Sequence, residues 1–382
     1  MYKIYKNQKL NLFTLKYYLI AGEASGDLHA SNLMKELKLQ DAEAEFRYLG
    51  GDLMQKHGGE LVKHFKETAY MGFLDVLLHL RAILKNISFI KEDILNYKPD
   101  VLILVDYPGF NLRIAEFAHT EGFKVYYYIS PKIWAWKQSR VHKIKKYIDK
   151  LFIIFPFEKE FYKQFNYEVE YVGNPIMDAI DISEPDFNTF KNKYDLSNKK
   201  IIALLPGSRK QEIKHNFPTM LEVAKNFQDY QFIVAAAPSL EKEVFEKHTE
   251  DFNIKLIYDD TYELLKHSEA AIVTSGTATL ETAILNTPEL VCYKGDYISY
   301  QIARRLIKID FVSLVNLVMQ KEVIKELLQY DMTVQNITQE LEQLLNNEVY
   351  KNNMLKNFDE MREKLGGKGA SKRTAEIIVQ SL

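Results

Sequence analysis

The stretch Thr274-Ser-Gly-Thr-Ala-Thr-Leu-Glu281 follows a short apolar run, Ala270 to Val273, and opens a helix-like segment. The first N–H groups of a helix have no partner within it and carry a partial positive charge, so a turn of small residues there favours an anion. Glu281 lies about one helical turn past Thr277, where a carboxylate can reach a ribose diol. The alternative is an ordinary helix cap, because Ser and Thr cap many helices.

A second segment of the same kind lies earlier in the chain. The apolar run Ile201 to Leu205 is typical of a buried strand, and Pro206-Gly-Ser-Arg209 follows it before a helix-capable run. A strand, a glycine turn and a helix in this order bring backbone amides to the carboxyl end of a parallel sheet. Arg209 adds a fork of donors that suits phosphate oxygens. Neither segment fits a Walker loop or G-x-G-x-x-G, and the two together favour a nucleotide-sugar site over a plain nucleotidase.

Outward from these segments, strand-like runs alternate with longer amphipathic ones in both halves of the chain. The runs are 17–21, 46–49, 101–105, 125–129 and 151–155, then 201–205, 231–235, 255–257, 270–273 and 289–293. This rhythm predicts an α/β protein with two doubly wound, Rossmann-like domains that face each other across a cleft. The expected divisions are an N-terminal extension, 1–16; an acceptor- and membrane-facing domain, 17–180; a UDP-sugar-binding domain, 181–355; and a C-terminal helical segment, 356–382.

Composition narrows the class of protein. The chain has 382 residues, 47% of them hydrophobic and 27% charged, as in ordinary globular proteins. A formal net charge of -2 argues against a dedicated nucleic-acid binder. The one cysteine, Cys292, excludes an internal disulfide and a cysteine-based zinc cluster, which fits a reducing cytoplasm. No apolar run reaches the ~18 residues of a spanning helix, and Lys16 interrupts the stretch that resembles a signal peptide.

The first half offers two polar loops after predicted strands. Gly22-Glu-Ala-Ser-Gly-Asp27 permits a tight turn, but its two acidic residues would repel a phosphate, so an uncharged sugar acceptor or simple capping by Ser25 and Asp27 is favoured. Asp106 ends the strand-like run Val101–Val105. There a low dielectric can raise the pKa of the carboxyl and prepare it as a proton acceptor. The alternative is a structural Asp that caps the next turn.

Apolar and basic residues suggest a surface for acyl chains or lipid. Both tryptophans lie in Ser130-Pro-Lys-Ile-Trp-Ala-Trp136, where core packing is the alternative, and a basic run follows that solvent exposure alone can explain. From Phe73 to Ile90, apolar residues at helical spacing, Leu80 and Leu84 among them, predict a stripe that faces the core. Leu74 and Leu78 do not lie on that stripe and are one helical turn apart. The candidates for membrane or acyl contact are Phe73, Leu74, Leu78, Trp134 and Trp136.

Several ordered motifs make the chain resemble lipid-A-disaccharide synthases, bacterial glycosyltransferases of the B-type two-domain fold. The resemblance begins near Lys16 and extends to the C-terminal region. Its motifs are Ala21-Gly-Glu-Ala-Ser-Gly-Asp27, Met71-Gly72, Asp106-Tyr-Pro-Gly-Phe-Asn111, Ser130-Pro131, Trp134-Ala-Trp136, Pro156-Phe-Glu158, Leu205-Pro-Gly-Ser-Arg209, Ser275-Gly-Thr-Ala278, Leu280-Glu281, Ser313-Leu314 and Asn316-Leu317.

The resemblance implies an inverting transfer from UDP-2,3-diacylglucosamine to 2,3-diacylglucosamine 1-phosphate in lipid A (lipopolysaccharide) biosynthesis. The products are the β-1,6-linked disaccharide 1-phosphate and UDP. It implies Asp106 as the general base and Glu23, Ser25 and Asp27 as the acceptor-side loop. The implied UDP-sugar-binding residues are Gly207, Ser208, Arg209, Ser275, Gly276, Thr277, Glu281, Asn316 and Gln335. Arg209 and amide dipoles can stabilise departing UDP, so we expect neither metal nor cofactor.

The same resemblance implies a peripheral protein at the cytoplasmic surface of the inner membrane, and family members can form homodimers. The chain departs from the family at Asn174, where a histidine is usual, and at Lys132-Ile133, where a small residue precedes Trp-Ala-Trp. Two alternatives remain open: another UDP-N-acetylglucosamine-using transferase or epimerase of the same fold, and a catalytically silent UDP-sugar-binding protein.

Overall fold

The protein, seen in a computed structural model, divides into two compact units. The structure describes residues 14–68, 79–181, 183, 186–252, 254–296, 300 and 310–382. The first unit ends at Pro175 and takes in the C-terminal stretch Lys368–Leu382, whereas the second runs from Ile176 to Gly367. The predicted extension lies mostly outside the described residues, and Lys16 is already part of the first strand.

The C-terminal region differs from the single helical segment predicted for 356–382. Helix α17 (Glu348–Lys364) belongs to the second unit, whereas α18 (Ala370–Gln380) belongs to the first. The reason is packing: α18 buries Ala375 and Ile378 and contacts helix α1 (Ala24–Gln40). The end of the chain therefore completes the unit in which the chain began.

Within the described residues, the first unit has a seven-stranded sheet in which all the pairs are parallel. Its order is β3-β2-β1-β4-β5-β6-β7. The strands are β1 (Lys16–Ala21), β2 (Glu45–Gly50), β3 (Glu60–His64), β4 (Val101–Val105), β5 (Lys124–Tyr128), β6 (Lys150–Ile153) and β7 (Glu170–Tyr171). The central strands are continuous apolar runs because helices cover both faces of a parallel sheet.

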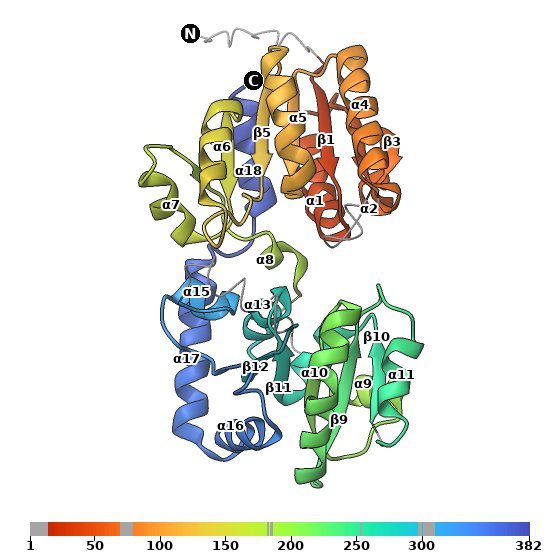
Figure 1. Ribbon diagram of the computed structural model, residues 1–382, viewed down its shortest axis with the longest axis vertical. Helices are drawn as coiled ribbons and strands as arrows, with labels where there is room; N and C mark the ends of the chain where they lie inside the picture. The colour runs from red at the N-terminus through yellow and green to blue at the C-terminus, as the bar shows by residue number, and fades with distance from the viewer. Residues whose placement is uncertain are drawn as a thin grey trace, which may run out of the picture. The chain divides into compact units, whose positions relative to one another are not determined.

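Helices lie on both faces of this sheet, and Figure 1 shows α4, α5 and α6 on the face opposite α18. Besides α1 and α18, they are α2 (Asp52–Gln55), α4 (Leu80–Tyr97), α5 (Pro108–Thr120), α6 (Val141–Tyr147) and α7 (Pro156–Lys163), with 3-10 turns at Phe65–Glu67 and Gln138–Arg140. Ile87 and Ile90 of the predicted stripe are buried, as expected, but Leu80 and Leu84 are 42% and 49% exposed. The core prediction is wrong for these two because the buried positions of α4 begin only at Asn86.

The second unit has a six-stranded parallel sheet among its described residues, in the order β10-β9-β8-β11-β12-β13. The strands are β8 (Lys200–Leu205), β9 (Tyr230–Ala236), β10 (Lys255–Tyr258), β11 (Ser268–Thr274), β12 (Glu289–Tyr293) and β13 (Glu326–Leu328). The helices, besides α17, are α8 (Ile176–Ala179), α9 (Phe187–Tyr194), α10 (Lys210–Val223), α11 (Glu243–Thr249), α12 (Thr261–Lys266), α13 (Thr277–Ile284), α15 (Leu314–Met319) and α16 (Val334–Asn346), with a 3-10 turn at Ala224–Asn226.

Each sheet reverses its strand order at one point. The reversal lies between β1 and β4 in the first unit and between β8 and β11 in the second. In open α/β sheets, ligands bind beside the carboxyl ends of the strands at such a switch point. The fold class of two Rossmann-like domains is therefore confirmed, and each domain offers one site of this kind. Among the described helices, none combines the length and the apolar character needed to cross a bilayer.

Candidate active site

Asp106 lies at the switch point of the first unit, directly after β4. Its N–H donates to the carbonyl of Tyr128 (3.1 Å), which ends the adjacent strand β5. Asp106 and Tyr107 both have left-handed backbone angles, with φ of 45° and 49°. Such angles are uncommon outside glycine and are held at a cost of about 1–3 kcal/mol each, often at functional sites. Pro108 then begins α5, where a missing N–H costs nothing.

Two side chains hold the carbonyl of Asp106. Asn111, which is fully buried, donates from Nδ2 to this oxygen (2.8 Å) and to that of Val105 (3.3 Å). The Tyr127 hydroxyl donates to the same Asp106 carbonyl. These bonds fix the strained turn and with it the direction of the Asp106 side chain. Asn111 belongs to a sequence motif that assigns it no role, and no sequence signal points to Tyr127, because only the pairing of β4 with β5 brings it to this turn.

Burial and charge act in opposite directions on the Asp106 carboxyl. Burial is the larger effect and raises the pKa of Asp106, while the positive charge of Lys132 and the N–H of Tyr107 lower it. The net direction is upward, as expected for a carboxyl at the end of a buried strand. A carboxyl whose pKa is raised binds a proton more strongly and is a better general base while it remains ionised.

The loop at Gly22–Asp27 adjoins this turn. A Cβ at Gly22 would lie 2.1 Å from the Tyr107 ring, so only glycine lets the two segments touch. Asp27 is buried, and its carboxylate accepts from the N–H groups of Gly51 (2.8 Å), Leu53 (3.0 Å) and Met54 (3.2 Å). It therefore satisfies N–H groups at the start of α2, a helix other than the one in which it lies. Glu23 is half-buried before α1, and Ser25 is exposed in the first turn of that helix.

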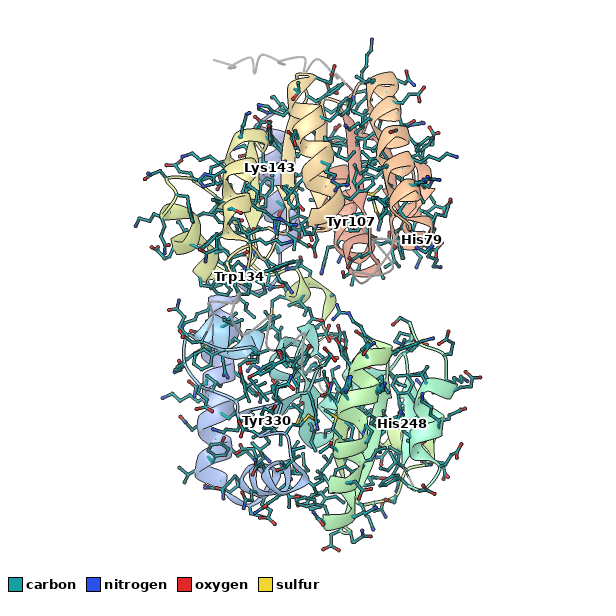
Figure 2. The ribbon with its side chains drawn as sticks, viewed as in Figure 1. His79, Tyr107, Trp134, Lys143, His248 and Tyr330 are labelled. Atoms are coloured by element: carbon teal, nitrogen blue, oxygen red, sulfur yellow. The ribbon has the colours of Figure 1, made fainter. Side chains whose placement is uncertain are left out.

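The two tryptophans have different environments. Trp134 is buried and packs edge-on against Phe157, with ring centroids 4.9 Å apart. Trp136 is 43% exposed, and the Lys137 ammonium lies 4.4 Å from its ring centroid. Figure 2 labels Trp134 and Tyr107, which lie at the same end of the first unit. Only Trp136 therefore presents its indole to solvent. The remaining candidates for acyl contact, Phe73, Leu74 and Leu78, lie outside the described residues.

In the second unit, the two predicted anion-binding turns lie side by side. They follow the neighbouring strands β8 and β11, whose register pairs Leu205 with Val273. Gly207 has a φ of +115°, and a Cβ there would lie 2.6 Å from a carboxylate oxygen of Glu212. Glycine is thus required at this position both by its backbone and by its neighbour.

Glu212 occupies donors that the sequence analysis assigned to phosphate. One carboxylate oxygen accepts from the Ser208 N–H (3.0 Å), and the other accepts from Nη1 of Arg209 (2.8 Å). Glu212 thus stabilises the amino end of α10. A glutamate in the first turn of a helix often caps the helix in this way. A phosphate at this turn has to share or replace these bonds. Glu212 was not among the predicted site residues, although its place three residues after Arg209 is a local signal for capping.

The turn before α13 is more open. Gly276 begins the helix without a side-chain cap, and a Cβ there would have only the Thr274 oxygen nearby, at 4.0 Å. Gly276 and Thr277 are exposed, whereas Ser275 is half-buried and donates from its hydroxyl to Val312 O (3.2 Å). Exposed amides at a helix start are a favourable place for an anion.

Glu281 lies one turn further along α13. It is half-buried, burial raises its pKa, and Oε1 accepts from the Tyr262 hydroxyl (3.2 Å). The carboxyl is therefore fixed beside the open turn.

Asn316 and Gln335 lie in different settings from these turns. Asn316 is fully buried: Nδ2 donates to Ile324 O and Glu326 Oε1, both at 2.9 Å, and Oδ1 accepts from the N–H groups of Val323 (2.8 Å) and Ile324 (3.1 Å). Its polar atoms thus support the chain around α15 and are used within the protein. Gln335 is exposed in the first turn of α16.

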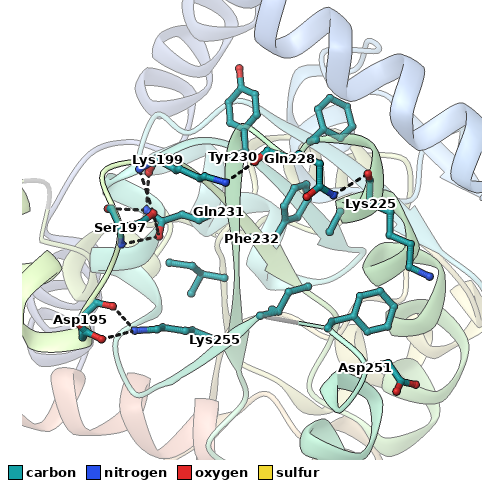
Figure 3. Close-up of a pocket in the computed structure, with 15 residues that line it drawn as sticks. Asp195, Ser197, Lys199, Lys225, Gln228, Tyr230, Gln231, Phe232, Asp251 and Lys255 are labelled. Atoms are coloured by element: carbon teal, nitrogen blue, oxygen red, sulfur yellow. Dashed lines mark hydrogen bonds and ion pairs between the residues drawn. The ribbon is translucent and has the colours of Figure 1, made fainter.

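A pocket of about 580 Å³ lies near the amino ends of β8, β9 and β10 (Figure 3), whereas the turns described above follow the carboxyl ends of their strands. Two of its lysines are bonded to the surrounding chain: Lys199 donates to Gln228 O (2.5 Å), and Lys255 donates to Tyr194 O (2.7 Å). It is remote from the switch point, so we do not assign the donor site to it. Cys292 is buried.

Comparison with known proteins gives one consistent result. Residues 17–380 match the model of the family described as lipid-A-disaccharide synthetase. A lipid-A-disaccharide synthase of Geobacter metallireducens is 36% identical over 370 residues, which cover 95% of this chain and 96% of that protein. The enzyme of the same name from Myxococcus xanthus is 37% identical over 372 residues, covering 95% of this chain and 97% of that protein.

Solved structures share the fold at low identity. The UDP-GlcNAc 2-epimerase from Neisseria meningitidis, bound to UDP-GlcNAc, superposes with a TM-score of 0.68 at 15% identity, covering 96% of this chain and all of that chain (100%). The calicheamicin glycosyltransferase gives a TM-score of 0.58 at 13% identity, with 96% and 98% covered. At these identities the likeness concerns the fold alone.

Proposed function

The chain belongs to the lipid-A-disaccharide synthase family, and from this premise we propose how its two units divide the reaction between them. As a member it is a glycosyltransferase that forms the lipid A disaccharide from a UDP-sugar and a lipid acceptor. We propose UDP-2,3-diacylglucosamine as the donor and 2,3-diacylglucosamine 1-phosphate as the acceptor. The products are then the β-1,6-linked disaccharide 1-phosphate and UDP.

The first unit supplies the base in this proposal. The acceptor 6-hydroxyl is a weak nucleophile, and Asp106 takes its proton while the hydroxyl oxygen attacks the anomeric carbon of the donor. The bond from that carbon to UDP breaks, UDP leaves with the electron pair, and an α-linked donor gives a β product. The observation that carries this assignment is the strained turn of Asp106, fixed by Asn111 and Tyr127 at the switch point.

The second unit binds UDP in this proposal. The open amino end of α13 receives the pyrophosphate, and Glu281 receives the ribose. Arg209, whose side chain is 71% exposed, reaches the phosphate from the neighbouring turn while Glu212 holds one edge of its guanidinium. These groups neutralise the charge that develops on departing UDP, so the proposal includes no metal.

Both substrates carry acyl chains, so the reaction belongs at the cytoplasmic surface of the inner membrane. The exposed Trp136 ring, with Lys137 and Arg140 beside it, supports this placement because an indole and cations together suit an anionic lipid surface. The unit that bears them is also the one to which we assign the lipid acceptor. Homodimer formation remains a prediction.

The base assignment is tested by Asp106→Asn. We expect kcat to fall at least ~100-fold, because general-base catalysis contributes about 10²–10⁴-fold. Binding of UDP, measured by calorimetry, should stay within about twofold. Glu121→Gln, an exposed change at the end of α5, is the charge-matched control and should retain normal turnover. An Asp106→Asn enzyme with more than about a tenth of normal kcat would rule out this base.

The donor is tested by offering acylated and unacylated UDP-glucosamine. We expect turnover of the acylated donor, with the disaccharide identified by mass spectrometry. Turnover of the unacylated donor alone would instead support the alternative of another UDP-N-acetylglucosamine enzyme. The family match does not favour that alternative.

A further inference from the structure

Lys132 occupies an unusual place beside the base. The chain leaves β5 at Ile129, whose φ of +66° is strained for a β-branched residue. Pro131 and Ile133 on either side of Lys132 are buried, whereas Lys132 is exposed. The loop therefore packs its neighbours into the unit and sends one cationic side chain outward.

The loop is anchored on both sides of Lys132. The Ser130 hydroxyl bonds to that of Tyr162 (2.6 Å), and the N–H of Ile133 donates to Pro131 O (2.6 Å). Trp134 is buried against Phe157. These contacts give the Lys132 backbone one fixed position.

Glu158 supports the same loop from α7. It is 1% exposed, and one of its oxygens, Oε2, accepts from the N–H groups of Ile154 (3.1 Å) and Phe155 (3.0 Å). The polar groups of Trp134 and Ser130 face its carboxyl. The loop is thus held by a buried polar cluster in addition to apolar packing, which makes it more rigid than an ordinary connection.

The pairing of β4 with β5 brings this loop next to Asp106. Asp106 and Ile129 each follow paired residues, Val105 and Tyr128, so the two chains leave the sheet side by side. Of the charged side chains in the described part of the unit, Lys132 acts most strongly on the Asp106 carboxyl.

The other titratable groups around the turn act mainly on Tyr127. Its hydroxyl donates to the Asp106 carbonyl, and Arg140 and Tyr162 face it from η2 (Gln138–Arg140) and α7. Glu158 faces Tyr162 on α7. Lys132 is therefore the cation whose main effect falls on the base itself.

We propose that Lys132 is a positioning residue that acts through Asp106, holding its carboxylate in the ionised form that accepts the acceptor's proton. The inference rests on the proposed role of Asp106 as the base. Burial favours the neutral carboxyl, which cannot accept a proton, and a positive charge on the neighbouring loop favours the carboxylate. The turn thus combines a half-buried carboxyl, whose pKa burial raises, with a positive charge that favours its ionised form.

The test is the pH dependence of kcat/KM for Lys132→Met and Lys132→Arg with the acylated substrates. We expect the acid limb of the Lys132→Met profile to lie at higher pH than in the unchanged enzyme. On that limb its kcat/KM should be lower by about threefold or more, and above the limb the two should agree within about twofold. Lys132→Arg, which keeps the charge, should restore the limb. Lys145→Met removes an exposed charge that bonds to Phe165 O and should leave the profile unchanged.

An unchanged acid limb in Lys132→Met, or an equal loss at every pH, would overturn the proposal. An equal loss would mean that Lys132 binds substrate and does not act through the base. Asp106→Asn is measured in parallel: if that variant keeps its activity, the base assignment fails, and the role of Lys132 fails with it. If Asp106→Asn is inactive and the Lys132→Met limb is unmoved, only the Lys132 proposal fails. Because Lys132 is exposed, its variants should fold normally, which tryptophan fluorescence can check.

Discussion

Asp106 depends on residues that are distant in the sequence but adjacent in the first sheet. Asn111 and Tyr127 bond its carbonyl, and Lys132 acts on its carboxyl. Each contact is individually modest, about 0.5–1.5 kcal/mol for a typical hydrogen bond. Their joint effect is to hold a strained backbone that a lone turn would relax. The proposed basicity of Asp106 therefore depends on three other residues as well as on Asp106 itself.

Glu158 makes a pH-dependent contribution to stability. Burial raises its pKa to about 7, well above the usual range of a glutamate. A group whose folded pKa is raised contributes stability that is present at low pH and is lost as pH rises from about 4.5 to about 7. In the unchanged protein, this effect lowers the free energy of unfolding by about 3 kcal/mol between pH 4.5 and pH 8. In Glu158→Gln, which has no titrating group at this position, that decrease should be absent. The Gln carbonyl can accept both bonds that Oε2 now accepts.

Urea unfolding followed by tryptophan fluorescence at several pH values measures this effect, because both tryptophans lie in the first unit. Glu160→Gln, on the same helix with a side chain 72% exposed, is the matched control and should keep the pH dependence of the unchanged protein. Equal slopes for Glu158→Gln and the unchanged protein would mean that Glu158 is not held protonated near neutrality.

Among the elements, α18 links the two ends of the chain. Arg373 donates from Nε to Val172 O (2.7 Å), and the Tyr126 hydroxyl bonds to Ser381 Oγ (2.9 Å). Ala375 and Ile378 are fully buried. A helix of eleven residues gains little stability by itself, so α18 is held by this packing.

Ile378→Ala should therefore destabilise the first unit by about 2–5 kcal/mol, because it leaves a cavity in a closed interface. The midpoint of urea unfolding, followed by tryptophan fluorescence, should fall accordingly. Leu39→Ala, at a position on α1 that is 70% exposed, should change the free energy of unfolding by no more than about 0.5 kcal/mol. A similar small change for Ile378→Ala would show that α18 does not support the unit.

At the scale of the whole molecule, each unit repeats one plan with a different chemistry. Both sheets reverse at a switch point, but one presents a half-buried carboxylate and the other presents a helix start and an arginine. In the second unit, the turn after β8 already binds an anion of the protein itself, the carboxylate of Glu212. The turn before α13 is therefore the principal candidate for the pyrophosphate.

UDP alone should protect the second unit and leave the Asp106 turn unaffected. A ligand at about 100 times its Kd stabilises the state that binds it by about 2.7 kcal/mol. We expect slower hydrogen exchange around 275–281, measured by mass spectrometry, and little change around 105–111. Uridine, which has no pyrophosphate, is the control and should protect the turn less. Protection confined to the first unit would contradict the donor assignment.

The amino-acid sequence by itself determined the central strands, the turns after them and the family. Val101–Val105 and Ile201–Leu205 are strands as predicted, because a strand buried on both faces must be apolar throughout. Strands β3, β7 and β13 were not predicted, and all three lie at sheet edges. Edge strands are short and partly exposed, so they do not require such a run.

Only the tertiary structure decided which polar groups meet. The return of α18 to the first unit depends on packing among separate segments, and so do the bonds of Asp27 to the start of α2. The same is true of Lys132, which the sequence shows merely as one member of a basic, aromatic loop. A local sequence pattern specifies a helix or strand because buried positions recur with the period of that element. A functional site depends instead on distances between separate elements, and no local pattern contains those distances.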